Sequence, residues 1–320
     1  MWSLKIRMYL LTAILFAIIY AVISMISYSM GVGNFYFYLV LSLVIMLAQY
    51  MIGPKIVEWS MRVRYLKDGE NPDLHRMVRD LAAVAKIPVP RIGVAQVAIP
   101  NAFAFGRTMR DSRICVTEGI LGLLDEEELK AVIGHEMSHI KNRDVLTITI
   151  LSVIPMILYR IAWQFLFFGD RKDRSGSNAA LIGLVAFLFY FLTNLLVLYA
   201  SRVREYFADK GSIDLGNRPS QLASALYKLV YGSARMPKSA IKDVEGMKAF
   251  FANDPSRALE EFKDLRSLDI DRSGTISSEE LKILQNKPMH LNFGDKLLEL
   301  LSTHPNMLKR IKRLSDWPRA

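Results

Sequence analysis

The clearest chemical signal in the chain is a run of five residues with a histidine at each end. His135, Glu136 and His139 stand in the order His-Glu-x-x-His. On a helix, two histidines four positions apart project from one face, at about the separation that one zinc ion requires. Glu136 lies one residue along, where it can reach a metal-bound water without ligating the ion. The pattern predicts a catalytic zinc with Glu136 as general base; a surface helix with two stray histidines is the alternative.

A catalytic zinc has three protein ligands, commonly two histidines and a glutamate, and keeps a fourth position open for water. Glu205 and Asp209 are candidates for the third ligand, because they lie one helical turn apart after an apolar segment. One of them can ligate the metal while the other orients a ligating histidine. Alternatively, both are solvated ion-pair partners of the nearby bases Arg202, Arg204 and Lys210.

A second metal signal lies nearer the C-terminus. The stretch from Asp269 to Glu280 fits the twelve-position loop of an EF-hand, with Gly274 at position six. The candidate calcium ligands are Asp269, Asp271, Ser273, Thr275, Ser277 and Glu280. We expect a calcium-binding helix-loop-helix insertion over about residues 256–290. EF-hands usually work in pairs and the sequence shows no second loop, so a polar hairpin that binds no calcium is the alternative.

Helices and a small sheet must hold the His-Glu-x-x-His motif in place. Asn71 or Asp73 can cap one helix, and Asp125 with Glu128 three residues later forms the capping signature of the helix that carries the motif. Between them, alternating and β-branched stretches predict short strands. We expect the segment that begins Asn101, Ala102 and Phe103 to offer an open strand edge to an extended substrate; an ordinary internal strand is the alternative.

Four apolar segments are candidates for membrane spans, since one crossing needs about 20 apolar residues. The predicted spans are about residues 8–30, 35–53, 145–169 and 178–201. The third contains Arg160, whose placement in lipid would cost about 2.5 to 3.5 kcal/mol, so this segment can instead rest on the membrane surface. However, if the metal ligands on either side of segments three and four share one site, the chain between them crosses an even number of times. A spanning fourth segment then requires a spanning third.

Composition limits the compartment and the partners. The chain of 320 residues is 52% hydrophobic, which is too apolar for a wholly soluble protein, and its net charge is +10. The basic residues are scattered beside apolar segments, which favours anionic lipid over nucleic acid. They flank the spans mainly on one side, which predicts that both termini and both polar regions are cytoplasmic. A single cysteine, Cys115, excludes an intramolecular disulfide and fits a reducing compartment.

Taken together, the motifs resemble those of the HtpX-type membrane zinc metalloproteases, which are related to the CaaX prenyl proteases. The matching stretches are Asn101-Ala102-Phe103-Ala104, His135 to His139, Arg204-Glu205-Tyr206 with Ala208-Asp209, and Ser302-Thr303-His304-Pro305. The resemblance implies that His135, His139 and Glu205 bind one zinc ion and that Glu136 is the catalytic acid and base. It also implies that Asp209 does not bind the zinc itself but contacts and orients a residue that does.

His304 is the candidate for a donor that stabilises the oxyanion of the reaction. The alternative is a histidine that merely starts a helix before Pro305. The basic tail, residues 309–313, is expected at the protein surface or against lipid headgroups.

The sequence therefore predicts a mainly α, multi-pass membrane protein with four transmembrane helices and a cytosolic zincin-like α+β catalytic domain. The expected division is a transmembrane hairpin over residues 1–54, the first catalytic part over 55–144, a second hairpin over 145–201 and the second catalytic part over 202–320. The expected function is zinc-dependent endopeptidase activity on polypeptide substrates, and the resemblance to the HtpX-type proteases implies a role in the quality control of membrane proteins. The alternatives are a CaaX-type prenyl protease and a calcium-responsive membrane scaffold with a structural zinc.

Overall fold

The computed structural model describes residues 35–167, 176–243, 255, 257–286 and 293–317. The chain divides into two compact units, Met1–Gly53 with Leu146–Val203 and Pro54–Val145 with Arg204–Ala320. The predicted membrane span at about residues 8–30 lies outside the described residues. The other three predicted spans coincide with long helices.

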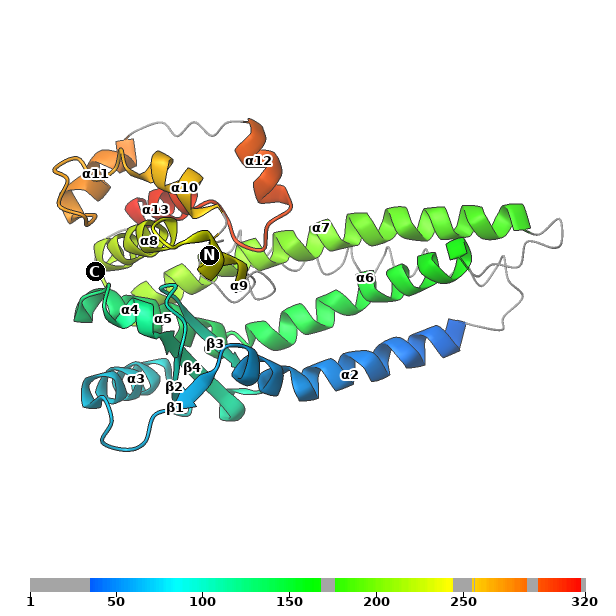
Figure 1. Cartoon of the computed structure of the whole chain (residues 1–320), viewed down its shortest axis with the longest axis horizontal. Helices are drawn as coiled ribbons and strands as arrows, with labels where there is room; N and C mark the ends of the chain where they lie inside the picture. The colour runs from blue at the N-terminus through cyan, green and yellow to red at the C-terminus, as the bar shows by residue number, and fades with distance from the viewer. Residues whose placement is uncertain (1–34, 168–175, 244–254, 256, 287–292, 318–320) are drawn as a thin grey trace. The chain divides into compact units, whose positions relative to one another are not determined.

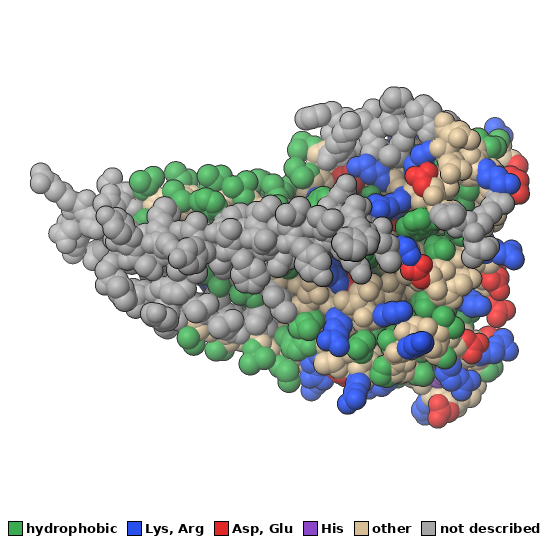
Figure 2. All heavy atoms as spheres, turned by 180° about the vertical axis from the view of Figure 1, so that it is seen from behind, with side chains coloured by type: hydrophobic (Ala, Val, Ile, Leu, Met, Phe, Trp, Pro, Cys, Tyr) green, Lys and Arg blue, Asp and Glu red, His purple; other side chains and the backbone are tan. Residues whose placement is uncertain are grey.

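Those long helices are α2 (Phe35–Ser60), α6 (Asp144–Phe167) and α7 (Gly176–Asp214), which Figure 1 labels. Within the first unit, α6 and α7 pack through buried aliphatic side chains, among them Leu158 and Ala186. Two described stretches, Asp144–Trp163 and Ala180–Asp214, are long and apolar enough to cross a membrane. Figure 2 shows hydrophobic side chains gathered over the long helices, and charged side chains over the unit that carries the sheet.

A four-stranded sheet forms part of the second unit. Its strands are β1 (Val63–Tyr65), β2 (Arg91–Ala95), β3 (Ala102–Gly106) and β4 (Ser112–Thr117), in the order β1-β2-β4-β3. β2 and β4 are parallel, whereas the two outer pairs are antiparallel. β3 is an edge strand, as an extended-substrate site requires. β1 was not predicted, because three residues are too short to show an alternating pattern.

The second unit also contains the ends of the long helices and a set of shorter ones. These are α3 (Pro72–Ala85), a 3₁₀ turn (Met109–Asp111), α4 (Glu118–Leu121), α5 (Glu126–Lys141), α8 (Pro219–Ala234), α9 (Lys238–Asp243), α10 (Ala258–Leu265), α11 (Ser278–Asn286), α12 (Phe293–Leu300) and α13 (Met307–Ser315). α5 packs against α3, α8 and the sheet, and α8 packs against α10 and α13. Both predicted caps are confirmed: Asn71 accepts from the Leu74 N–H, and Asp125 and Glu128 form a reciprocal capping box.

Two glycines let α5 and the end of α7 approach closely. A Cβ atom at Gly134 would lie 2.4 Å from the side-chain nitrogen of Asn217, and one at Gly211 would lie 2.5 Å from the Cβ of Ser138. The Ser212 hydroxyl donates to the carbonyl of Ala131 at 2.6 Å across the same contact. α5 and α7 therefore lie so close together, beside the predicted metal ligands, that only glycine fits at positions 134 and 211.

This contact makes a stability prediction. Gly211→Ala adds a methyl group where there is no space, so we expect the free energy of unfolding to fall by about 1–3 kcal/mol. Gly122→Ala is the matched control, because nothing lies within 4 Å of a Cβ atom there. Thermal unfolding of both variants in the same detergent measures the difference, and equal stabilities would show that α5 and α7 do not approach this closely.

Candidate metal centre

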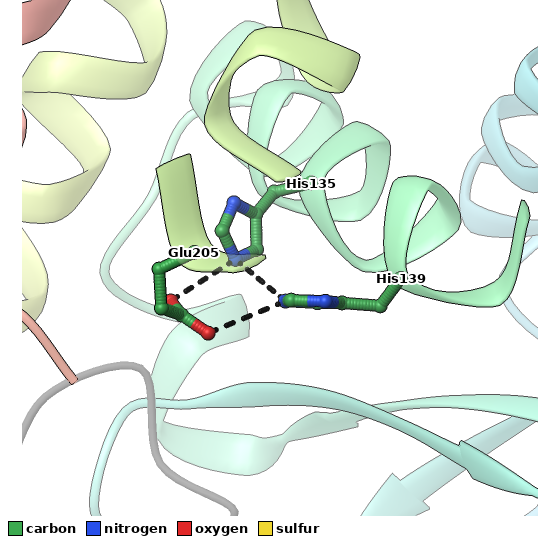
Figure 3. A group of neighbouring side chains, drawn as sticks. All are labelled: His135, His139 and Glu205. Carbon is green, nitrogen blue, oxygen red and sulfur yellow. Dashed lines mark hydrogen bonds and ion pairs between the residues drawn. The ribbon is translucent and has the colours of Figure 1, made fainter. Parts of the chain in front are cut away.

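α5 and α7 bring the three predicted metal ligands together (Figure 3). The Nε2 atoms of His135 and His139 lie 3.1 Å apart. Glu205, on α7, places one carboxylate oxygen 3.6 Å from Nε2 of His135 and the other 3.5 Å from Nε2 of His139. All three side chains come from the second unit, and their ligand atoms lie within 4.8 Å of one another.

These distances fit a zinc ion. A tetrahedral site with zinc–ligand bonds of about 2.0–2.1 Å separates its ligand atoms by about 3.3 Å. Among the described residues, no donor makes a well-aligned hydrogen bond to the buried Oε2 of Glu205, although Nη1 of Arg310 lies 3.1 Å away. Two nitrogen lone pairs and a carboxylate oxygen that face one another repel, unless a cation lies between them. The donor set therefore matches the ligands of a catalytic zinc.

A carboxylate and a guanidinium hold His135 from behind. Its Nδ1 atom lies 2.9 Å from Oδ1 of Asp209, which directs Nε2 toward the other ligands. Asp209 in turn accepts two hydrogen bonds from Arg310 of α13, at 3.0 and 2.5 Å. Arg310 is 1% exposed, so the expectation that the whole basic tail lies at the surface is wrong for this residue. Its charge balances the two buried carboxylates, Asp209 and Glu205.

His139 is held in the same way by different residues. Its Nδ1 atom lies 2.6 Å from Oδ2 of Asp144, the first residue of α6. Asp144 forms an ion pair with Arg204, whose guanidinium also donates to the carbonyl of Asn142 at 3.2 Å. Each imidazole thus presents Nε2 to the candidate metal position while its Nδ1 is fixed by a carboxylate that an arginine neutralises.

The electrostatic field of the site favours positive charge at the candidate metal position. Burial would lower the pKa of His135, but the nearby carboxylates of Asp209 and Glu205 raise it to about 9. Burial would raise the pKa of Glu205, yet the nearby side chains of His304, Arg310 and His135 hold it well below its usual range. Glu205 therefore remains a carboxylate, the form that binds a metal.

Glu136 lies between the ligands and the sheet edge. Its side chain is buried, which raises its pKa, and the nearby histidines oppose that shift. The backbone N–H of Ala104 donates to its carboxylate. Because neighbouring strand residues point their backbone groups to opposite sides and Asn101 faces β4, Ala102 and Ala104 face the open edge of β3. The predicted general base thus adjoins the edge where an extended peptide would pair.

The other predicted substrate residues support this edge from within. Asn101 is 1% exposed, and its backbone exchanges hydrogen bonds with Thr117. The ring of Phe103 is buried and stacks on Phe105, with 5.8 Å between ring centroids. The structure therefore places the side chain of Phe103 in a hydrophobic core, and leaves Ala102 with its backbone at the edge.

His304 lies beside the three ligands. Its Nε2 atom is 3.8 Å from Oε1 of Glu205, and its Nδ1 atom is 3.0 Å from the hydroxyl of Thr303. The helix α13 begins three residues later, with Asn306 as its N-cap. His304 thus precedes a helix and also faces the site, so the structure agrees with both interpretations, a helix-start residue and a candidate oxyanion donor.

Sequence reasoning missed Asp144 and Arg310 as parts of this site. Asp144 looked like the last polar residue before an apolar segment, and its only signal was its place five residues after His139. Arg310 stood in a run of four basic residues among five, with nothing in the sequence to separate it from Lys309 or Lys312. Both act through tertiary contacts, which residue spacing alone does not encode.

The predicted calcium residues also converge. Carboxylate oxygens of Asp269, Asp271 and Glu280 lie within 4.8 Å of one another. The Ser273 N–H donates to both aspartates at 2.9 Å, and the Ser277 N–H donates to Glu280 at 2.8 Å. Helices α10 and α11 flank the loop.

The fold and the site together define the class of protein. A helix with His-Glu-x-x-His, a glutamate from a second helix, and apolar helices long enough to cross a membrane are the features of a membrane metallohydrolase. The profile of Peptidase family M48 matches residues 68–318, and the chain belongs to this family.

Individual relatives agree with the family. The chain is 51% identical over 229 residues to a "Protease HtpX homolog" of Methanothermobacter thermautotrophicus, covering 72% of this chain and 86% of that protein. It is 32% identical to the "Protease HtpX homolog" of Moorella thermoacetica, covering 98% and 93%. The crystal structure of S. mikatae Ste24p shares the fold, with a TM-score of 0.52 and 18% identity over 99% of this chain and 67% of that one. The protein is a membrane-integrated metalloprotease, as the sequence predicted.

The support behind His139 gives a testable result. Asp144→Asn keeps the size of the side chain but removes the charge that fixes the imidazole, so we expect metal affinity to fall about 10- to 100-fold. Competition with a chromophoric chelator measures this affinity. Asp214→Asn is the control, since Asp214 is an exposed carboxylate that pairs with Lys210. Equal affinities in the two variants would exclude a supporting role for Asp144.

Proposed function

We propose that the chain is a zinc-dependent endopeptidase with His135, His139 and Glu205 as zinc ligands and Glu136 as general base. One observation carries the proposal: two imidazole Nε2 atoms and a carboxylate meet at zinc-ligand distances, with a second carboxylate one residue from the first histidine. Asp209 and Asp144 orient the imidazoles, and Arg310 and Arg204 balance their charge.

Zinc bound by these residues would supply a Lewis acid and a water of lowered pKa. Glu136 accepts the proton of the attacking water and returns it to the leaving amine. His304 faces the same position and donates to the oxyanion. Burial of His135, Glu136 and Glu205 keeps bulk water away from these charges and strengthens their interactions.

The peptide substrate adds a strand at the open edge of β3, within the segment Asn101, Ala102 and Phe103. The outward backbone groups of Ala102 and the carbonyl of Ala104 pair with its main chain. This pairing recognises backbone rather than side chains, so it suits extended and unfolded segments. Asn101 and Phe103 fix the strand from its inner side through Thr117 and the hydrophobic core.

The membrane arrangement that we propose has four spans, at about residues 8–30, 35–53, 145–169 and 178–201. The chain is then divided at residues 54, 144 and 201 between two transmembrane hairpins and two parts of one catalytic domain. Both termini and the catalytic domain lie in the cytoplasm, because the basic residues flank the spans on that side. A site at the cytoplasmic face suits membrane proteins as substrates, which favours a role in their quality control.

Two other functions are distinguishable from this one. A CaaX-type protease would cleave a prenylated C-terminal peptide in preference to an unfolded membrane protein. A membrane scaffold with a structural zinc would retain its function when the general base is replaced. The buried position of Glu136 at the strand edge favours an enzyme, since a structural zinc site needs no general base.

Glu136→Gln tests the mechanism. The amide cannot accept a proton from water, so we expect the cleavage rate to fall about 100- to 10,000-fold while bound zinc, counted by atomic absorption, is unchanged. Glu126→Gln, an exposed position on the same helix, is the control and should cleave normally. A Glu136→Gln protein with full activity would refute the assigned base.

We also propose that the loop from Asp269 to Glu280 binds calcium. Calcium takes carboxylate and carbonyl oxygens at about 2.3–2.6 Å, so its ligands lie up to about 5 Å apart. The carboxylate oxygens of Asp269, Asp271 and Glu280 lie within 4.8 Å of one another. Gly274 has a positive φ of 81°, which the sharp turn at position six of such a loop requires. Because Ser273 and Ser277 replace acidic residues, the expected dissociation constant is on the order of 10⁻⁴ M.

Calorimetry on the full chain tests calcium binding. We expect heat of binding and a higher unfolding temperature at millimolar calcium for the wild type. The Asp269→Asn, Glu280→Gln double variant loses two charged ligands and should show neither effect. A wild type without heat or a thermal shift would retire the proposal and leave the zinc assignment untouched.

A further inference from the structure

Helix α12 exposes apolar side chains and buries an acidic one, which is the reverse of the pattern expected for a helix in contact with water. Leu297, Leu298 and Leu300 of the helix are 50%, 45% and 42% exposed, and Leu301, the residue after it, is 53% exposed. Positions separated by one and four residues share one side of a helix. Glu299, which projects to the other side, is only 8% exposed. The apolar face of α12 is thus turned outward and its acidic residue inward.

The inward face ties α12 to the metal centre. Glu299 forms an ion pair with Lys309 of α13, one residue before Arg310. Arg310 in turn pairs with Asp209 and Glu205 of α7. Tyr206 directly follows the ligand Glu205. α12 is therefore fixed beside the part of α7 that carries the ligand.

The position of Tyr206 on α7 sets the level of α12 relative to lipid. Residues 175–201 carry no charge, and Tyr206 follows Ser201 by five residues of the same helix. Five residues rise about 7.5 Å, which is about the thickness of one headgroup layer outside the hydrocarbon core. The guanidinium of Arg313 lies 4.5 Å from the centre of the Tyr206 ring. An aromatic ring beside a cation is typical of the membrane interface.

We propose that α12 is an interfacial helix whose leucine face, Leu297, Leu298 and Leu301, inserts into the cytoplasmic leaflet of the bilayer that holds α7. Chain connectivity favours the bilayer as the occupant, because α12 is tied through α13 to the part of α7 that begins just beyond the apolar run. Interfacial helices bury their apolar faces about 5–10 Å into the headgroup and acyl boundary. Such insertion also anchors His304, three residues after Leu301, since the intervening chain spans at most about 11 Å.

Site-specific fluorescence on the full chain tests this placement. Leu298→Cys is labelled with bimane and reconstituted in vesicles of equal parts phosphatidylcholine and phosphatidylglycerol. Cys115 is fully buried and burial raises its pKa to about 12, so little label should attach to it. The wild type, treated with the same label, measures this background. We expect lipids brominated on the acyl chains to cause about a twofold loss of fluorescence, and aqueous iodide to cause little.

Val84→Cys is the matched control, because Val84 is an apolar residue of the same unit that is 56% exposed. Its label should respond to iodide and not to brominated lipid. The proposal is overturned if the label at position 298 behaves like the control. It is also overturned if, in detergent, shielding of that label from iodide depends on protein concentration, which indicates a second copy of the chain. Shielding from iodide only after a peptide is added would overturn it too, because that indicates bound substrate. Cleavage is not measured, so the result is independent of the proposed mechanism.

Discussion

The repulsion among buried atoms of His135, His139 and Glu205 is the constraint on which the rest of the structure depends. Two imidazole nitrogens and a carboxylate face one another over 3.1–3.6 Å, and nothing in an apolar protein interior would hold them there without support. The support is the same on both sides: each Nδ1 meets an aspartate, and each aspartate meets an arginine. The two arginines lower the cost of burying the acidic groups, and the aspartates leave each imidazole one orientation in which its free nitrogen points at the metal position.

The supporting residues come from segments far apart in the chain. His135 and His139 lie on α5, Asp144 begins α6, Glu205 and Asp209 end α7, and Arg310 lies near the C-terminus on α13. The site is therefore complete only when both halves of the second unit have joined across the apolar segments that separate them in sequence. A chain lacking α13 would leave Asp209 and Glu205 buried without the balancing charge of Arg310.

Local signals in the sequence predicted the parts of the site that local chemistry determines. The capping box at Asp125 and Glu128 marked the start of α5, and the four-residue spacing of the histidines placed them on one face. Glu205 and Asp209 were found through helical spacing, although spacing alone did not decide which one is the ligand. The strand β1 was missed because it is short, and Asp144 and Arg310 because their roles arise from contacts with residues that are distant in sequence or lie on another helix. The third apolar segment forms one helix, α6, with Pro155 inside it and Arg160 exposed, so neither residue breaks the helix.

α7 continues without a break from Gly176 to Asp214, a length of about 58 Å. It contains the apolar run and, further along, the proposed ligand Glu205 and its neighbour Asp209. Ser201, where the uncharged run ends, and Glu205 are four residues apart on this helix, a rise of about 6 Å. Moving that carboxylate farther from the apolar run would require α7 to unwind. A peptide that reaches the proposed metal position must therefore be presented close to where the apolar run ends.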